Sequence, residues 1–208
     1  FVPLAAVTEP ELIASSIATA VGLLAPTRTP FERITEHFAD REALIVLDNF
    51  EQVVAGAPVV ADLLRAAPRL RILVSSRAPL SVAGEQEFAV PPLPLPPADA
   101  TDPEVVAASQ AVSLFVERAA AVRPGLAVTA ENAAALAEIV RRLDGMPLAI
   151  ELAAARIRIL TPSAMVARLG DRLGLLSGGG RDLPERQRTL RGAVAWSHDL
   201  LDPDRQRL

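Results

Sequence analysis

Lysine and cysteine are both absent from this 208-residue chain, and histidine occurs only twice. Without cysteine, the chain can form neither a disulfide framework nor a thiolate metal site. The two histidines, His37 and His198, are too few for the multi-histidine clusters that hold catalytic zinc. All 21 basic residues are arginine. Any chemistry that requires a lysine must therefore come from outside this sequence.

An excess of positive charge and long apolar runs are lacking as well. The formal net charge is -4 and the pI is near 5.3, which excludes a global basic field of the kind that drives sequence-independent binding to nucleic acid. No apolar run approaches the roughly 20 residues of a membrane helix. The first residues also lack the basic n-region of a signal peptide. We therefore expect a cytoplasmic protein that does not bind membranes.

Half of the residues are hydrophobic, enough to build the core of one or two packed domains. The sequence opens on Phe1 without an initiator methionine, and its last residues, LDPDRQRL, have the pattern of a helix that is starting. Both ends favour the interpretation that this sequence is a piece of a larger protein.

The first half alternates short apolar runs with helical patterns, which is typical of a parallel sheet covered by helices. The predicted strands are 1–7, 43–50, 69–76 and 85–93, and the predicted helices are 9–24, 30–40 and 57–68. The strand at 43–50 is apolar on both faces, which predicts a central position in the sheet.

A proline-rich segment, Pro91–Glu104, ends this pattern because proline removes a backbone donor and favours extended backbone. The following sequence is helical in pattern, and Phe115 and Trp196 lie at core positions of the predicted helices. The sequence thus predicts an α/β core over 1–97, a helical subdomain over 98–176, and a linker with a further helical region over 177–208.

Polar side chains follow two buried strands at the point where each strand ends. The strand at 43–50 ends in polar residues at Asp48 and Asn49, with Glu51 next. The strand at 69–76 ends in Ser75 and Ser76, with Arg77 next. Ligands of open parallel sheets bind at the carboxyl ends of strands, where loops and helix N-termini converge. An acid and an arginine at one edge suit a nucleoside triphosphate with Mg²⁺. Polar residues are also common at strand ends without any such role.

Four motifs resemble one family of ATPases. LIVLDNFEQV looks like the Walker B strand of a P-loop ATPase, and RILVSSRAPL looks like the sensor strand of the STAND class of signal-transduction ATPases. LDGMPLAIELAAARIRIL is similar to the GLPLA motif of NB-ARC proteins and of large LuxR-like and AfsR-like bacterial regulators. LPERQRTLRGAVAWSHDLL resembles the segment leading into their winged-helix domain. The resemblance covers most of the chain.

The resemblance implies a fold and a set of site residues. The fold would be a parallel P-loop-type sheet with flanking helices, its central P-loop strand missing, then an all-α lid and the start of a winged-helix region. Asp48 would hold Mg²⁺, Arg77 would sense the γ-phosphate, and Pro147 would border the adenine of ATP or ADP. Glu51 is a weaker candidate for polarising the attacking water. Asn49 would lie beside the nucleotide, but an amide cannot act as a base, so hydrolysis should be slow.

The lysine-bearing phosphate loop of the family would precede Phe1. The glycine cluster SGGGRD, 177–182, follows no strand and lacks lysine, so it is interpreted as a linker. Because the missing strand would lie between the sensor strand and the strand near Phe88, we expect the latter to be poorly paired. We also expect weak nucleotide affinity and no ATPase activity for this sequence alone.

The predicted function is the ATP/ADP-binding switch region of a multidomain signal-transduction ATPase that regulates transcription. Self-association on activation and DNA binding through a separate output domain would follow from the family's behaviour. One alternative is a non-catalytic interaction scaffold that keeps the fold without nucleotide. Another is direct DNA binding through Arg186, Arg188 and Arg191, although Asp182 and Glu185 lie among them.

Overall fold

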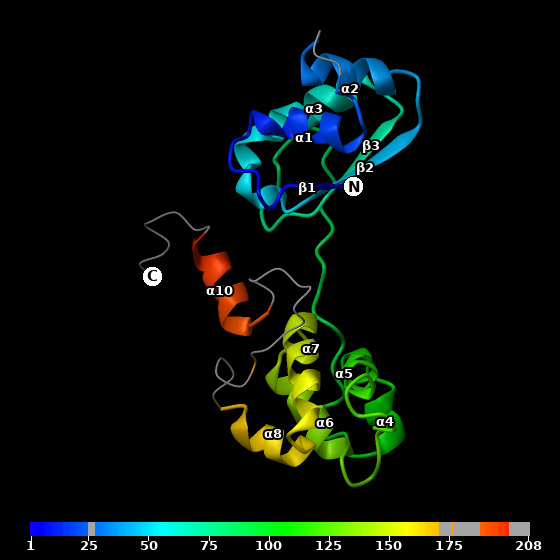
Figure 1. The fold of residues 1–208 in the computed structure, drawn as a ribbon. Coiled ribbons are helices and arrows are strands. Elements are labelled where there is room, and N and C mark those ends of the chain that lie inside the picture. Colours follow the sequence, from blue (N-terminus) through cyan, green and yellow to red (C-terminus); the bar gives the residue numbers. More distant parts are fainter. Residues whose placement is uncertain (25–27, 171–175, 177–187, 200–208) are drawn as a thin grey trace. The chain divides into compact units, whose positions relative to one another are not determined.

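A computed structural model describes residues 1–24, 28–170, 176 and 188–199, which form two compact units, Phe1–Ala89 and Val90–Leu208 (Figure 1). The division lies eight residues before the boundary predicted at 97. The linker at 177–182, most of the predicted winged-helix region and the side chain of Trp196 lie outside the described residues. Among those described, no helix is long and apolar enough to cross a membrane.

The first unit contains a three-stranded parallel sheet in the order β1-β2-β3. The strands are β1 (Val2–Pro3), β2 (Ala43–Asp48) and β3 (Leu70–Val74). Helices α1 (Leu12–Ala20) and α2 (Pro30–Phe38) connect β1 to β2, and α3 (Ala57–Ala66) connects β2 to β3. The unit is thus built from β-α-β crossovers, as the alternating sequence pattern predicts.

Within the part of the chain that the structure describes, one face of this sheet is buried and the other is largely exposed. Ile45 and Leu47 of β2 lie in the core, whereas Leu44 is 61% exposed, and Leu73 of β3 is 58% exposed. The register pairs Val46 with Leu73, and Leu44 lies two residues before Val46 in the same strand. Leu44, Val46 and Leu73 therefore lie on the same, uncovered face. The predicted central position of β2 is correct, but the burial predicted for both of its faces is not found among the described residues.

The fourth predicted strand, 85–93, is not formed. Phe88 is 85% exposed and Val90 is 84% exposed. A strand requires a partner for its backbone groups, and a favourable residue pattern cannot replace that partner. The expectation of poor pairing near Phe88 is therefore confirmed, while the strand itself is a wrong prediction.

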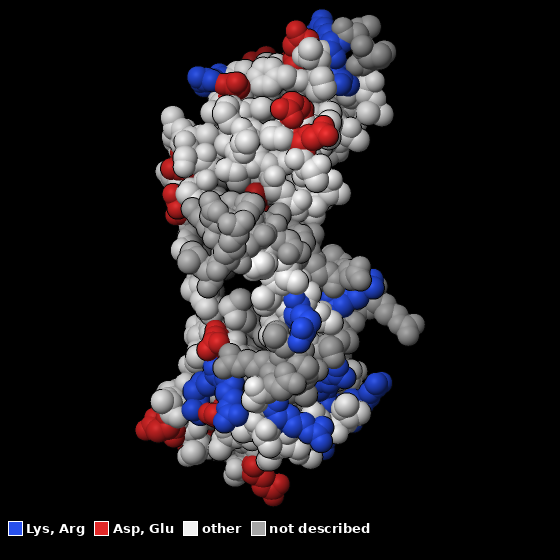
Figure 2. All heavy atoms as spheres, turned by 90° about the vertical axis from the view of Figure 1, so that its left-hand side faces the viewer, with Lys and Arg blue, Asp and Glu red and all other residues white. Residues whose placement is uncertain are grey.

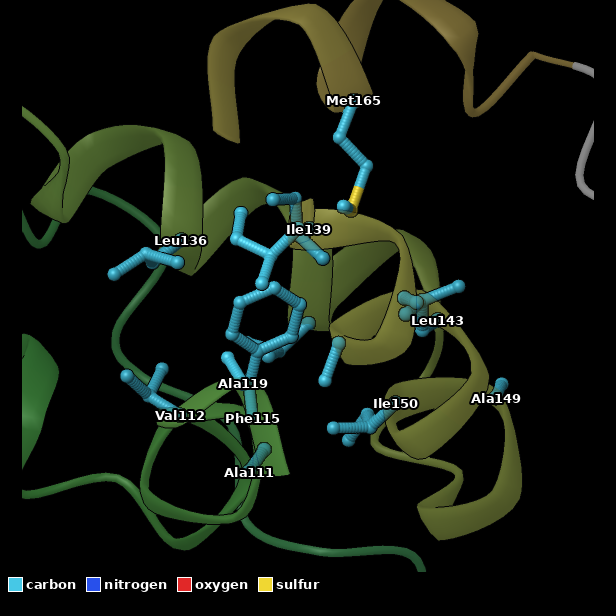
Figure 3. Packing of buried hydrophobic residues seen from close by; sticks show 14 of the residues in the cluster. Ala111, Val112, Phe115, Ala119, Leu136, Ile139, Leu143, Ala149, Ile150 and Met165 are labelled. Carbon is cyan, nitrogen blue, oxygen red and sulfur yellow. The ribbon is translucent and has the colours of Figure 1, made fainter. Parts of the chain in front are cut away.

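The second unit is helical. It contains α4 (Pro103–Ala107), α5 (Gln110–Ala120), α6 (Ala133–Arg142), α7 (Pro147–Ala155), α8 (Pro162–Arg168) and α10 (Leu190–Asp199). The fully buried ring of Phe115 lies within the cluster drawn in Figure 3, near Ile139 of α6 and Ile150 of α7. The core position predicted for Phe115 is confirmed.

The proline-rich segment packs on this helical unit. The Leu93 N–H donates to the Gly145 carbonyl at 3.0 Å, and the Ser109 hydroxyl donates to the Pro94 carbonyl at 2.9 Å. Gly145 has φ +66°, and a Cβ there would lie 2.4 Å from the Leu93 carbonyl oxygen. These contacts give the physical reason why residues 90–97 belong to the second unit.

Gly145→Ala is expected to lower the free energy of unfolding by about 3 kcal/mol, because alanine resists a positive φ and its Cβ meets the Leu93 backbone. Gly125→Ala is the matched control, since Gly125 has φ +83° and open space around its Cβ position. It should cost only about 1 kcal/mol. Urea unfolding measures both, and equal losses would show that the Leu93 contact contributes nothing.

Phe115→Ala should cost about 3 to 5 kcal/mol, because it empties a fully buried ring site between helices. Phe88→Ala removes the same side chain from an exposed position and should stay within about 0.5 kcal/mol of wild type. Thermal unfolding of the two variants tests the core and the missing strand together. A large loss for Phe88→Ala would mean that this residue is buried in solution.

Candidate functional site

The carboxyl end of β2 leads into a tight turn at Asn49. The Asp48 carbonyl accepts the Leu4 N–H at 2.8 Å, which ties this strand end to the segment after β1. Asn49 follows with φ 63° and ψ 47°, a left-handed conformation in which asparagine is enriched among non-glycine residues. The chain then enters a 3-10 helix, Phe50–Gln52, that buries the Phe50 ring. Asn49 therefore has a conformational role that the sequence analysis did not identify.

Ser75 connects the ends of β2 and β3. The register places Leu47 beside Val74, so Asp48 lies across from Ser75. The Ser75 hydroxyl donates to Asp48 Oδ1 at 2.5 Å and accepts the Asn49 N–H at 3.0 Å. This serine orients the Asp48 carboxylate. The sequence analysis identified Ser75 only as a polar residue at the end of a strand.

Glu51 and Arg77 form an ion pair at the same edge. Arg77 Nε lies 3.4 Å from Glu51 Oε1, and the Asn49 side-chain amide donates to that same oxygen at 3.4 Å. The Glu51 side chain is only 9% exposed, whereas that of Arg77 is 41% exposed. The mostly buried Glu51 side chain thus has an ion-pair partner, Arg77, and a neutral hydrogen-bond donor, the Asn49 amide.

The predicted site residues are therefore distributed over both units. Asp48, Asn49, Glu51 and Arg77 meet at the adjacent carboxyl ends of β2 and β3 in the first unit. Pro147 belongs to the second unit, where it is the first residue of α7, as its pattern predicts.

Pro147 lines a shallow groove of about 320 Å³ on the helical unit. Leu93 and Leu114 give the groove an apolar lining beside Pro147. Four further residues supply polar groups, and these are Gln110, Ser113, Glu117 and Glu151. With four polar residues among the seven that line it, the groove is more polar than the usual small-molecule site.

The carboxylates of the first unit fit magnesium only together with a phosphate ligand. Among the described residues, no group of three or more histidine, aspartate or glutamate side chains is arranged to hold a metal. Mg²⁺ commonly binds through one or two carboxylates, several waters and substrate phosphates. Asp48, with one carboxylate oxygen engaged by Ser75, matches that kind of ligand.

Arginine side chains gather on the face of the helical unit that Figure 2 shows. Arg158, Arg168 and Arg191 are exposed. Arg141 and Arg142 both pair with Glu138, at 3.1 and 2.7 Å. Of the arginine stripe considered for DNA, Arg188 and Arg191 are described and exposed, while Arg186 lies outside the described residues.

Comparison with known proteins finds relatives that match nearly the entire chain. A Mycobacterium tuberculosis protein, provisionally named an HTH-type transcriptional regulator, is 43% identical over 208 residues, which is 99% of this chain and 22% of that protein. An identically matching protein of Mycobacterium bovis carries the same kind of name. An uncharacterised M. tuberculosis protein is 39% identical over 205 residues, which is 97% of this chain and 49% of that protein.

The chain thus spans about a fifth of the length of the first relatives and about half of the other. No protein-family model matches the sequence, and no solved structure matches it.

Ser75→Ala should lower the free energy of unfolding by about 1 kcal/mol, because it removes a donor to a carboxylate and the acceptor for the Asn49 N–H. Ser75→Thr keeps the hydroxyl and fits a strand end, so it should retain most of the stability. Urea unfolding of both variants checks this role. If Ser75→Ala and Ser75→Thr matched wild type equally, the hydroxyl would not hold the turn.

Proposed function

We propose that this chain is the nucleotide-binding switch region of a larger protein that regulates transcription. The observation that carries the proposal is that Asp48 and the Glu51–Arg77 ion pair lie at the adjacent carboxyl ends of β2 and β3. Asp48, oriented by Ser75, and Arg77, paired with Glu51, are what a bound metal and a terminal phosphate would require there. The regulatory part of the proposal is supported by the names of the mycobacterial relatives.

The proposed ligands are ATP and ADP with Mg²⁺. Asp48 would hold the metal through its water shell, and Arg77 would contact the γ-phosphate. Since the chain has no lysine, a phosphate-cradling lysine would be supplied by residues outside this sequence. The motif resemblance supports assigning this arrangement to the STAND class of P-loop ATPases, in which β3 would be the sensor strand.

Such a site would act as a switch with slow turnover. Members of the STAND class often carry a second acid at the position that Asn49 occupies here. The left-handed backbone of Asn49 forms the turn after β2. The base would then have to be Glu51, whose carboxylate is held by Arg77 and Asn49. Exchange of ADP for ATP would change self-association, and a separate segment of the larger protein would bind DNA.

A non-catalytic interaction scaffold is the second candidate. The uncovered sheet face with Leu44 and Leu73 supports it, because exposed apolar side chains on one face mark surfaces that other polypeptide covers. The two candidates differ in one property, magnesium-dependent nucleotide binding.

Asp48→Asn in the complete gene product should weaken Mg·ATP binding at least tenfold, because the metal loses its charged ligand. Asp62→Asn is the matched control. Asp62 is also a partly exposed carboxylate of the first unit, where it pairs with Arg65 on α3. Isothermal titration with and without Mg²⁺ measures the effect. Absence of nucleotide binding by the wild-type protein would reject the switch and favour the scaffold.

A further inference from the structure

The Glu51 carboxylate is balanced by groups from two segments. Arg77 comes from the loop after β3, and Asn49 from the turn after β2, and both approach the single oxygen Oε1 at 3.4 Å. A carboxylate that is 9% exposed would be costly to bury as an anion without such donors. The Glu51 carboxylate therefore already neutralises part of the Arg77 charge within the protein.

Arg77 is the movable member of this pair. Its side chain is 41% exposed, while Glu51 is anchored by the 3-10 helix Phe50–Gln52, which begins at the fully buried Phe50. Arg77 is therefore the partner of this pair that a ligand can reach from solvent, while the Glu51 side chain is enclosed. Any anion that binds at this edge must compete with Glu51 for the guanidinium.

We infer that Glu51 is an internal counter-ion that competes with the terminal phosphate of the nucleotide for Arg77, and so sets the preference between ATP and ADP. This inference rests on the proposed function. ADP lacks the γ-phosphate, so its binding leaves the Glu51–Arg77 pair in place. ATP binds at the expense of that pair and loses part of the energy of its γ-phosphate contact.

This role differs from that of a general base. A base is needed for hydrolysis only, so its removal leaves the affinities for ADP and for a non-hydrolysable ATP analogue unchanged. A counter-ion lowers the affinity for the triphosphate alone. Binding measured without turnover therefore separates the two roles.

Glu51→Gln is the informative variant because glutamine has the same shape and retains Oε1 as an acceptor for Asn49 and Arg77. It removes the negative charge and replaces the second carboxylate oxygen with an NH2 group. In the complete gene product, Glu51→Gln should raise the affinity for a non-hydrolysable ATP analogue about fivefold relative to ADP, since a charged hydrogen-bond partner is replaced by a neutral one. Arg77→Ala should lower the ratio of the ATP-analogue affinity to the ADP affinity below that of the wild-type protein.

The double variant, Glu51→Gln with Arg77→Ala, completes the test. If Glu51 acts through Arg77, the double variant should show the same affinity ratio as Arg77→Ala alone. An unchanged or lowered ratio in Glu51→Gln would overturn the inference while leaving the proposed function intact. A wild-type protein that binds neither nucleotide would overturn both.

Discussion

The parallel pairing of β2 with β3 is the constraint on which the candidate site depends. Five consecutive residue pairs, from Ala43 with Leu70 to Leu47 with Val74, place the two strand ends at the same height. A shift of one residue would turn Asp48 toward the core face and separate it from Ser75. The apolar core face, with Ile45 and Leu47 inside, prevents that shift. Hydrophobic burial on one side of the sheet thereby sets the geometry of polar groups at its end.

Within this frame, each polar residue has a partner that explains it. Ser75 uses its hydroxyl twice, as a donor to Asp48 and as an acceptor from the Asn49 backbone. Asn49 supplies both a left-handed turn and an amide for Glu51. Glu51 in turn holds Arg77. Function, as we propose it, would consist of a nucleotide entering this hydrogen-bonded arrangement and redistributing its charges.

The helical unit is organised around a second constraint, the close approach of the backbone at Gly145 to Leu93. No residue with a Cβ fits that approach without movement. It draws the proline-rich segment onto the helices and places Leu93 beside Pro147 at the border of the groove. The proline-rich segment, which the sequence analysis interpreted as the end of the α/β pattern, is therefore packed on the helical unit that it precedes.

Several features follow from the sequence by itself. Apolar runs that end in Asp48 and Val74 predict strands, because their length and flanking residues match buried parallel strands. Helical periodicity places Phe115 in a core, and a proline in the first turn places the start of α7 at Pro147. The candidate acid and arginine could be named for the same reason, since both lie at the carboxyl ends of predicted strands.

Only the tertiary structure decided which of those residues meet. The predicted strand at 85–93 has a suitable residue pattern but no partner strand among the described residues. Its strand propensity was therefore not enough for a strand to form. The contacts of Ser75 with Asp48 and of Arg77 with Glu51 join residues that are 26 or more positions apart in the sequence. The contact of Asn49 with Glu51 depends on the left-handed turn at Asn49. Local sequence patterns report burial and backbone preference, whereas such contacts depend on the register between strands, which exists only in the folded chain.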